Sequence, residues 1–150
     1  MKALIQRVSQ AKVTVEGKIA GEIGKGILVF LGVAHDDNEK DVDYLIEKII
    51  NLRIFQSEKS GFDQSVQDVN GSLLVVSQFT LYGDIKKGRR PDFTAAAKPE
   101  LAEALYDSFI KKAHKMGLNA ASGAFGAMMD VELVNDGPVT LILESLKNKY

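Results

Sequence analysis

An uninterrupted apolar run from Ile27 to Val33 (ILVFLGV) constrains the fold of this chain more than any other feature. Such a run is typical of a central strand that is covered on both of its faces. A second run, Ser72–Leu81 (SLLVVSQFTL), predicts another core strand. Strands of this kind need packed layers on either side, so we expect helices that lie against a sheet.

Two amphipathic helices are predicted to supply that cover. Asn38 is a good N-cap for the first helix, and Asp41 follows three residues later, as in a capping box. Apolar positions with helical spacing follow at Val42, Leu45, Ile46, Ile49 and Ile50. Pro99 suits the first turn of the second helix, and Gly117 suits its end. The apolar face of this second helix is expected at Leu101, Ala102, Leu105, Phe109, Ala113 and Met116.

Short β-prone segments fill much of the remaining chain. They are expected at Ala3–Val8, Ala11–Val15, Ile19–Ile23, from Arg53 to Phe55, and at Ala120–Ala124, Met128–Val134 and Val139–Glu144. The first two are predicted to form a hairpin, Gly137-Pro138 is predicted to separate the last two, and Tyr82–Thr94 is predicted to be a long surface loop.

The order of these elements predicts the fold class. Strands and helices interleave only partly, which argues against a doubly wound sheet and against a barrel of repeated βα units. We expect a mixed α/β fold in β/β/α layers, in which two helices pack on a curved, barrel-like, mainly antiparallel sheet. No linker, repeat or low-complexity tract is evident, so residues 1–150 are predicted to form a single domain.

Composition excludes several classes of protein. The chain has no cysteine, so it has no disulfide framework, and a reducing compartment such as the cytoplasm is expected. It has neither a signal-peptide pattern nor an apolar run long enough to cross a bilayer, so no membrane partner is expected. The net charge of −1 argues against a strong nonspecific nucleic-acid binder, and no DNA partner is expected. A local basic cluster does occur, at Lys86, Lys87, Arg89 and Arg90.

The sequence offers little for metal or triad chemistry. Its two histidines are too few for a tetrahedral nitrogen and sulfur site, so no metal and no cofactor are expected. His35 is interpreted as a loop or capping residue, and His114 as a solvated residue on the polar side of its helix. No G-x-S-x-G elbow and no phosphate-binding glycine motif is present.

Two polar segments remain to be explained. Ser77-Gln78-Phe79-Thr80 brings three hydroxyl or amide side chains to the end of an apolar strand. Buried polar groups there must be paired or face a ligand, so the segment is either an ordinary strand end or a site. Asn135–Thr140 (NDGPVT) is, on composition, a plain turn between strands.

These same segments resemble the paired signature motifs of the D-aminoacyl-tRNA deacylase family. Ser77–Leu81 (SQFTL) and Asn135–Thr140 (NDGPVT) match them in order and spacing. The resemblance extends to three further segments, Leu4–Val8 with Gly17, Gly26–Phe30, and Gly123–Met129, and it covers essentially the whole chain.

The resemblance implies a homodimeric, tRNA-binding hydrolase that acts as a proofreading enzyme. It would cleave the ester between a D-amino acid and the terminal ribose of tRNA, at a site between the two subunits. A cis peptide between Gly137 and Pro138 would present backbone carbonyls that reject L-residues, with Arg7 fixing the orientation of this turn. Glycine has no side chain to clash, so tRNA mischarged with glycine is a second expected substrate.

The resemblance also implies roles for other residues. Ser77, Gln78, Phe79 and Thr80 would form the catalytic cradle, with backbone N–H groups near Phe79 and Thr80 stabilising the oxyanion. Phe125, Gly126 and Met129 would bind the terminal adenosine, unless they are ordinary core residues. The basic cluster would contact acceptor-stem phosphates, unless it is a solvated loop.

Three alternatives stay open at this point. Thr80 could be a nucleophile, although no general base stands in an identifiable relation to it. The chain could be a generic esterase that uses Ser77 or Thr80, or a noncatalytic RNA-binding module, including one that acts only beside a synthetase. Leu146–Tyr150 (LKNKY) carries no interpretable pattern.

Overall fold

The computed structural model describes residues 1–59 and 61–145. The terminal segment Leu146–Tyr150 lies outside the described residues. The elements, in chain order, are β1 (Lys2–Val15), β2 (Lys18–Ile23), β3 (Gly26–Gly32), α1 (Glu39–Asn51), β4 (Phe55–Gln56), β5 (Phe62–Gln64), β6 (Ser72–Ser77), the 3₁₀ helix η1 (Phe79–Tyr82), α2 (Pro99–Lys115), β7 (Asn119–Ser122) and β8 (Asp130–Glu144).

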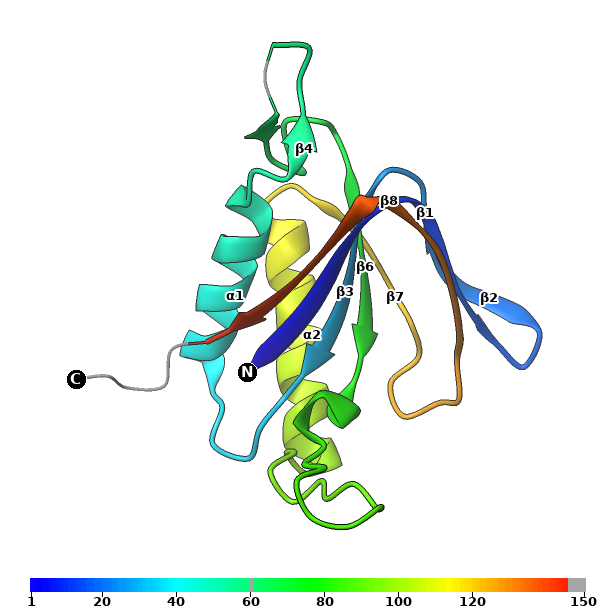
Figure 1. The fold of residues 1–150 in the computed structure, drawn as a ribbon, viewed down its shortest axis with the longest axis vertical. Helices are drawn as coiled ribbons and strands as arrows, with labels where there is room; N and C mark the ends of the chain where they lie inside the picture. The colour runs from blue at the N-terminus through cyan, green and yellow to red at the C-terminus, as the bar shows by residue number, and fades with distance from the viewer. Residues whose placement is uncertain (60, 146–150) are drawn as a thin grey trace.

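A curved, mixed sheet forms the centre of the fold (Figure 1). Its strands lie in the order β2-β1-β3-β6-β7, and β8 pairs with β1. The pairings of β1 with β2, β3 and β8 are antiparallel, whereas those of β3 with β6 and of β6 with β7 are parallel. A Cβ atom on Gly21 would lie 2.4 Å from the carbonyl oxygen of Ser122, so β2 and β7 nearly touch and the sheet is almost a closed barrel. The predicted fold class is confirmed.

Both helices pack on the same side of this sheet, as Figure 1 shows. Asn38 caps α1 in a full capping box with Asp41, and Pro99 begins α2, both as predicted. Ile27, Val29 and Leu31 of β3 face the core that includes the helices, while the alternating Leu28 belongs to a second core inside the barrel. The run from Ile27 to Val33 is therefore apolar because both faces of this strand are covered.

Two boundary predictions were wrong. The segment 3–15 is one strand, β1, and not a hairpin, because β1 changes partners along its length: residues 2–8 pair with β3 and residues 11–15 pair with β2. The segments 130–134 and 139–144 likewise belong to one strand, β8, which follows β1 throughout. Two register shifts between these strands, beside Val8, accommodate the intervening turn without ending β8.

A smaller boundary difference lies at the end of β6. The predicted strand Ser72–Leu81 ends at Ser77, and the chain then turns into η1.

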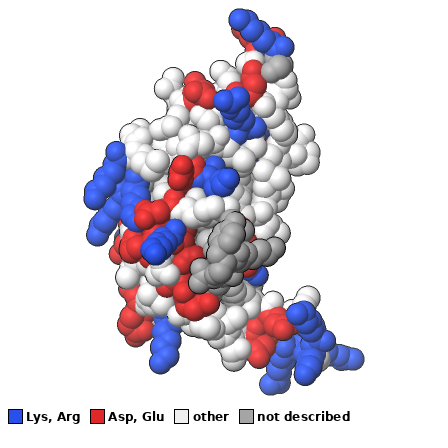
Figure 2. All heavy atoms as spheres, turned by 90° about the vertical axis from the view of Figure 1, so that its left-hand side faces the viewer, with Lys and Arg blue, Asp and Glu red and all other residues white. Residues whose placement is uncertain are grey.

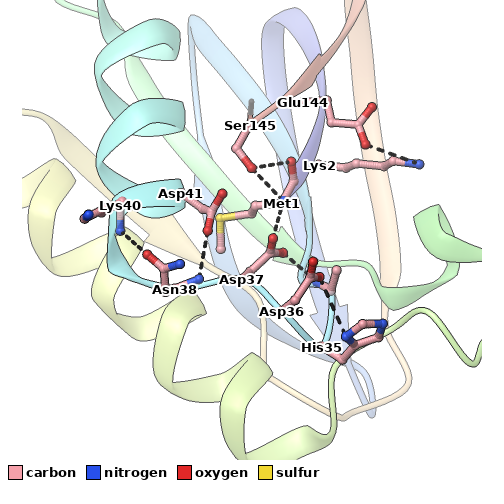
Figure 3. A network of polar contacts seen from close by, with 11 residues as sticks. Met1, Lys2, His35, Asp36, Asp37, Asn38, Lys40, Asp41, Glu144 and Ser145 are labelled. Carbon is pink, nitrogen blue, oxygen red and sulfur yellow. Dashed lines mark hydrogen bonds and ion pairs between the residues drawn. The ribbon is translucent and has the colours of Figure 1, made fainter. Parts of the chain in front are cut away.

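A buried polar network ties the start of β1 to the end of β8 (Figure 3). The amino group of Met1 donates to Asp37 Oδ1 at 2.6 Å and to Ser145 Oγ at 2.7 Å. Asp37 Oδ2 accepts from the Ala34 N–H, so one buried carboxylate holds both the amino group and the loop before α1. His35 lies exposed in this loop, 3.7 Å from Asp36. No helix of the described chain is long and apolar enough to span a bilayer.

The Tyr106 hydroxyl joins α2 to the sheet. It is buried and donates to the Val75 carbonyl at 2.8 Å, and burial raises the pKa of Tyr106 to about 12. The Val75 carbonyl also accepts from the Gly123 N–H, so it keeps a partner if Tyr106 loses its hydroxyl. We expect Tyr106→Phe to lower the free energy of unfolding at pH 8 by about 1 kcal/mol, as measured by urea denaturation.

The same hydroxyl predicts a loss of stability in alkali. Between the ordinary tyrosine pKa of about 10 and the raised pKa, the unfolded chain releases this proton while the folded chain retains it, so stability falls as pH rises. Burial shifts the pKa of Tyr82 in the same direction. Urea denaturation at pH 8, 10 and 11 should show a shallower fall in Tyr106→Phe than in wild type. Equal falls would contradict this assignment.

Candidate functional site

A cavity of about 790 Å³ opens at the end of the barrel where β3 and β6 finish. Its walls come from the ends of these strands, from η1, from the N-terminal turn of α2 and from the connection between β7 and β8. The lining is largely apolar: Leu31, Val33, Val76, Ser77, Gln78, Phe79, Thr80, Phe93, Ala96, Ala97, Lys98, Pro99, Ala102, Phe125, Gly126, Ala127, Met128, Met129 and Val131. Such a pocket suits a small ligand with an apolar or aromatic part.

The polar side of the cavity is built by the end of β6. The Gln78 N–H donates to the Leu31 carbonyl at 2.8 Å, which fixes the chain where it leaves the sheet. The next residues, Phe79 and Thr80, form the first turn of η1, and N–H groups in a first helical turn have no acceptor within their own helix. Two backbone donors therefore stand at the rim of the cavity.

The environment of the Thr80 hydroxyl bears on whether it could act as a nucleophile. The Gln78 side-chain amide donates a hydrogen bond to Thr80 Oγ1, and Thr80 itself is exposed. An amide cannot take up the proton that a nucleophilic hydroxyl must release. This pairing suits Thr80 better to positioning than to nucleophilic attack.

The opposite wall of the cavity follows β7. The Gly123 N–H donates to the Val75 carbonyl at 3.1 Å, and a turn at Phe125-Gly126 then brings the chain back toward β8. A Cβ atom on Gly123 would lie 2.7 Å from the sulfur of Met129, so the absence of a side chain at Gly123 makes room for Met129. Phe125 is half-buried against Tyr106, with ring centroids 5.8 Å apart.

Sequence reasoning missed the part of the wall that precedes α2. Phe93 packs edge-to-face against Phe79, with centroids 5.1 Å apart, and Ala96, Ala97 and Lys98 complete this wall. Phe93 lies at the end of the predicted loop Tyr82–Thr94, whose charged composition indicates only solvent exposure, and the other three residues follow this loop. The one available signal is Phe93, an aromatic residue among polar neighbours.

The four cations of the basic cluster lie on a projecting loop next to η1. The loop is closed by two backbone hydrogen bonds between Asp84 and Asp92, of 2.8 and 2.9 Å. Lys86, Lys87, Arg89 and Arg90 are all exposed. Figure 1 places this loop at the lower end of the molecule, and Figure 2 shows positive charge gathered at that end. The cluster thus lies at the same end of the molecule as the cavity.

The Gly137-Pro138 turn lies elsewhere. Its peptide is cis, Gly137 has a φ of +141°, and neither residue lines the cavity. Gly137 is six residues beyond Val131 along β8, which corresponds to roughly 20 Å at ~3.3 Å per residue. The Asn135 side chain holds the turn: its Oδ1 accepts from the Val139 N–H at 3.0 Å, and its Nδ2 donates to Thr140 Oγ1 at 2.9 Å.

Arg7 is the cation that supports this turn. Its Nε donates to the Asp136 carbonyl at 2.9 Å and lies 3.3 Å from the Asp136 carboxylate. Its Nη1 donates to the Ile54 carbonyl. Arg7 is only 6% exposed, so its charge is balanced by these oxygens and not by water.

The structure therefore separates the predicted site residues into two groups. One group lines the cavity: Ser77, Gln78, Phe79, Thr80, Phe125, Gly126 and Met129. Arg7, Gly137 and Pro138 form the second group at the other end of β8. Among the described residues, no group of three or more His, Cys, Asp or Glu side chains is arranged to hold a metal ion.

Fold and cavity together define a nearly closed α/β barrel with an apolar pocket beside the polar end of β6 and a 3₁₀ turn. A family model described as D-Tyr-tRNA(Tyr) deacylase matches residues 4–144. The chain belongs to this family, and it is a hydrolase.

Proteins and structures similar to the chain agree with this assignment. A protein of Clostridioides difficile (strain 630) named D-aminoacyl-tRNA deacylase is 57% identical over 148 residues, 99% of either chain. One of the same name from Thermosipho africanus (strain TCF52B) is 56% identical over 147 residues, 98% of this chain and 99% of its own.

Two solved structures share the fold. One, described as a c-Myc DNA Unwinding Element Binding Protein, has a TM-score of 0.91 and 44% identity, and the match covers 98% of this chain and 100% of that one. The other, described as a probable eukaryotic D-amino acid tRNA deacylase, has a TM-score of 0.83 over 95% of this chain and 98% of that one. At 18% identity it supports the fold alone.

Proposed function

We propose that this protein hydrolyses the ester of D-aminoacyl-tRNA and releases free D-amino acid and tRNA. Family membership and the names of relatives that match the full chain support D-aminoacyl-tRNA deacylase activity. The observation that carries the finer proposal is the position of the Gly137-Pro138 turn, which projects from β8 at a distance from the cavity. This separation supports a site in which the turn of one copy of the chain meets the cavity of another copy.

A homodimer would bring the two together. The strand β8 and the connection before it carry exposed apolar side chains: Met128 is 92% exposed and Ile142 72%. Val134 and Leu141 of β8 are exposed as well, and several large exposed apolar groups along one strand are typical of a surface that a partner covers. In the proposed dimer, the turn of one subunit enters the cavity of the other, so each active site contains both groups of residues.

The turn would select the configuration of the substrate by exclusion. Backbone carbonyls beside the α-carbon leave room for the side chain of a D-residue, while the side chain of an L-residue would collide with them. Gly137 lets the backbone approach closely because it has no Cβ. Recognition through the main chain ignores side-chain identity, so many D-amino acids, and glycine, would be accepted.

Catalysis would rest on positioned donors and on the RNA. The N–H groups of Phe79 and Thr80, in the first turn of η1, would stabilise the oxyanion that forms on the ester carbonyl, with Ser77 and Gln78 beside them. The 2′-hydroxyl of the terminal adenosine would assist the attacking water, which suits a cavity whose lining has no carboxylate or histidine. The adenine would stack on Phe125 beside Gly126 and Met129, so these residues would form part of an RNA-binding site. The enzyme would act in the cytoplasm.

The family assignment argues against the two alternative functions, a generic esterase and a noncatalytic RNA-binding module, but it does not test them directly. A generic esterase would form an acyl-enzyme on Ser77 or Thr80 and would show a burst of product. A noncatalytic RNA-binding module would bind tRNA without turnover. Deacylation by the purified protein distinguishes all three.

The primary test compares D-Tyr-tRNA with L-Tyr-tRNA. We expect the D-ester to be hydrolysed at least about 100-fold faster, because the turn excludes the L-residue. Equal hydrolysis of both esters would indicate a general esterase, and no hydrolysis would indicate a binding module.

Gly137→Ala tests the turn within the same assay. The new Cβ would lie 2.9 Å from the Val139 nitrogen and 3.2 Å from Arg7 Nη2, at a φ that side chains rarely adopt. The turn must shift, so hydrolysis of the D-ester should fall about 10- to 100-fold. An unchanged rate and an unchanged D-over-L ratio would remove the turn from the mechanism.

Thr80→Ala separates positioning from nucleophilic catalysis. We expect activity within about tenfold of wild type, because loss of a true nucleophile costs roughly 10⁶-fold. Circular dichroism and the oligomeric state serve as controls for the fold. Abolished activity in a correctly folded variant would make Thr80 the nucleophile.

Charge reversal at Arg89 and Arg90 tests the basic loop. If these cations contact phosphates, the Arg89→Glu, Arg90→Glu double variant should raise KM for tRNA. The slope of log KM against log salt concentration should fall by about two. The exposed pair Lys111 and Lys115 on α2, changed in the same way, is the matched control. An unaltered KM and salt slope would show that the loop is merely solvated.

A further inference from the structure

The guanidinium of Arg7 is held by Ile54, Phe55 and Phe62 as well as by the turn it supports. Nη1 donates to the Ile54 carbonyl, immediately before β4. The rings of Phe55 and Phe62 lie over the guanidinium, with Cζ 6.0 Å and 5.6 Å from their centroids. Arg7 therefore links β1, the β4–β5 hairpin and the Gly137 turn through a single side chain.

The two rings differ in their burial and in their contribution to the core. Phe55 is 1% exposed and belongs to the main core. Phe62 is 57% exposed and is not one of the buried residues of either core. Packing of the core does not account for an aromatic residue at position 62, whereas its contact with Arg7 does.

The hairpin that carries Phe62 is itself anchored. Ser57 Oγ donates to the Asp63 carboxylate at 2.6 Å, and Phe62 pairs with Gln56 across the hairpin. A register shift between Phe55 and Gln56 marks a bulge, which can re-aim the side chains of a strand. Phe62 is thus held in place by local contacts and not by burial.

An aromatic cover should strengthen the hold of Arg7 on the turn. A ring over a guanidinium attracts the cation and keeps water away from it. Hydrogen bonds from the guanidinium to the Asp136 and Ile54 carbonyls are stronger where water does not compete for the donors. Removal of the Phe62 ring would expose this side of Arg7 and loosen the turn without opening the core.

We propose that Phe62 is a positioning residue for stereospecificity, which acts through Arg7 on the Gly137-Pro138 turn. This inference rests on the proposed function, because it assumes that the turn selects the configuration of the substrate. Phe62 makes no contact with the reacting ester in this account. Its substitution should therefore change the ratio of rates for D- and L-substrates more than it changes the rate of ester hydrolysis at the Ser77–Thr80 cradle.

The test measures kcat/KM for D-Tyr-tRNA and L-Tyr-tRNA in Phe62→Ser. We expect the D-over-L ratio to fall about three- to tenfold, the range of an aromatic contact with a cation. Phe62→Tyr, which keeps the aromatic face, should restore the ratio. Ile19→Ser on β2 is the matched control, because Ile19 is 56% exposed and lies outside both groups of site residues.

A double-mutant cycle shows whether the effect passes through Arg7. Phe62→Ser should have no further effect on the ratio in an Arg7→Lys background if the two side chains act as a unit. In the otherwise wild-type protein, the ¹⁵N-detected Nε–H of Arg7 should exchange with solvent several-fold faster in Phe62→Ser. This measurement does not depend on enzymatic activity, and it shows directly whether the Phe62 ring shields the guanidinium from water.

The outcomes separate this inference from the proposed function. A wild-type protein without preference for the D-ester would overturn both. A wild-type preference that Phe62→Ser leaves within twofold, or that Ile19→Ser lowers equally, would overturn the role of Phe62 alone. Effects of Phe62→Ser that are undiminished in the Arg7→Lys background would also overturn it.

Discussion

The antiparallel pairing of β8 with β1 is the constraint on which the rest of the structure depends. It runs from the pair Lys2–Glu144 to the pair Thr14–Asp130 and fixes where each part of β8 can lie. The start of β8 reaches the cavity at Val131, and the Gly137 turn lies about 20 Å further along the strand. One chain therefore cannot bring its own turn to its own cavity without breaking this pairing, and the proposed mechanism needs two copies.

A second interaction, the hydrogen bonding of Arg7, ties the turn to β1 and to the residue before β4. A buried cation is costly unless oxygens surround it, and Arg7 finds them on Asp136 and Ile54. These acceptors belong to segments that are far apart in sequence. The turn is thus tied through Arg7 to the β4–β5 hairpin, where Phe62 lies over the guanidinium. In the proposed mechanism, substitutions in that hairpin would alter selectivity although they lie outside the cavity.

Much of the fold could be predicted from local sequence, and the site only in part. The capping box at Asn38 and the apolar run at Ile27 are local signals, and both gave the correct element. The continuity of β1 could not be predicted from local sequence. Its first half pairs with β3 and its second half with β2, and this change of partner arises only in the folded sheet. Phe93 was missed for a similar reason: only folding brings its ring to Phe79. The site roles themselves came from a family resemblance and remain proposals.

The most direct test of the central claim uses two variants in one dimer. Gly137→Ala damages the turn and Phe125→Ala damages the cavity, so each homodimer has two defective sites in this account. Co-expression with different tags allows the mixed dimer to be purified. A site shared between subunits predicts that the mixed dimer has one intact site and recovers about half of the wild-type D-Tyr-tRNA deacylation per dimer. Activity no higher than the mean of the two variants would contradict a shared site.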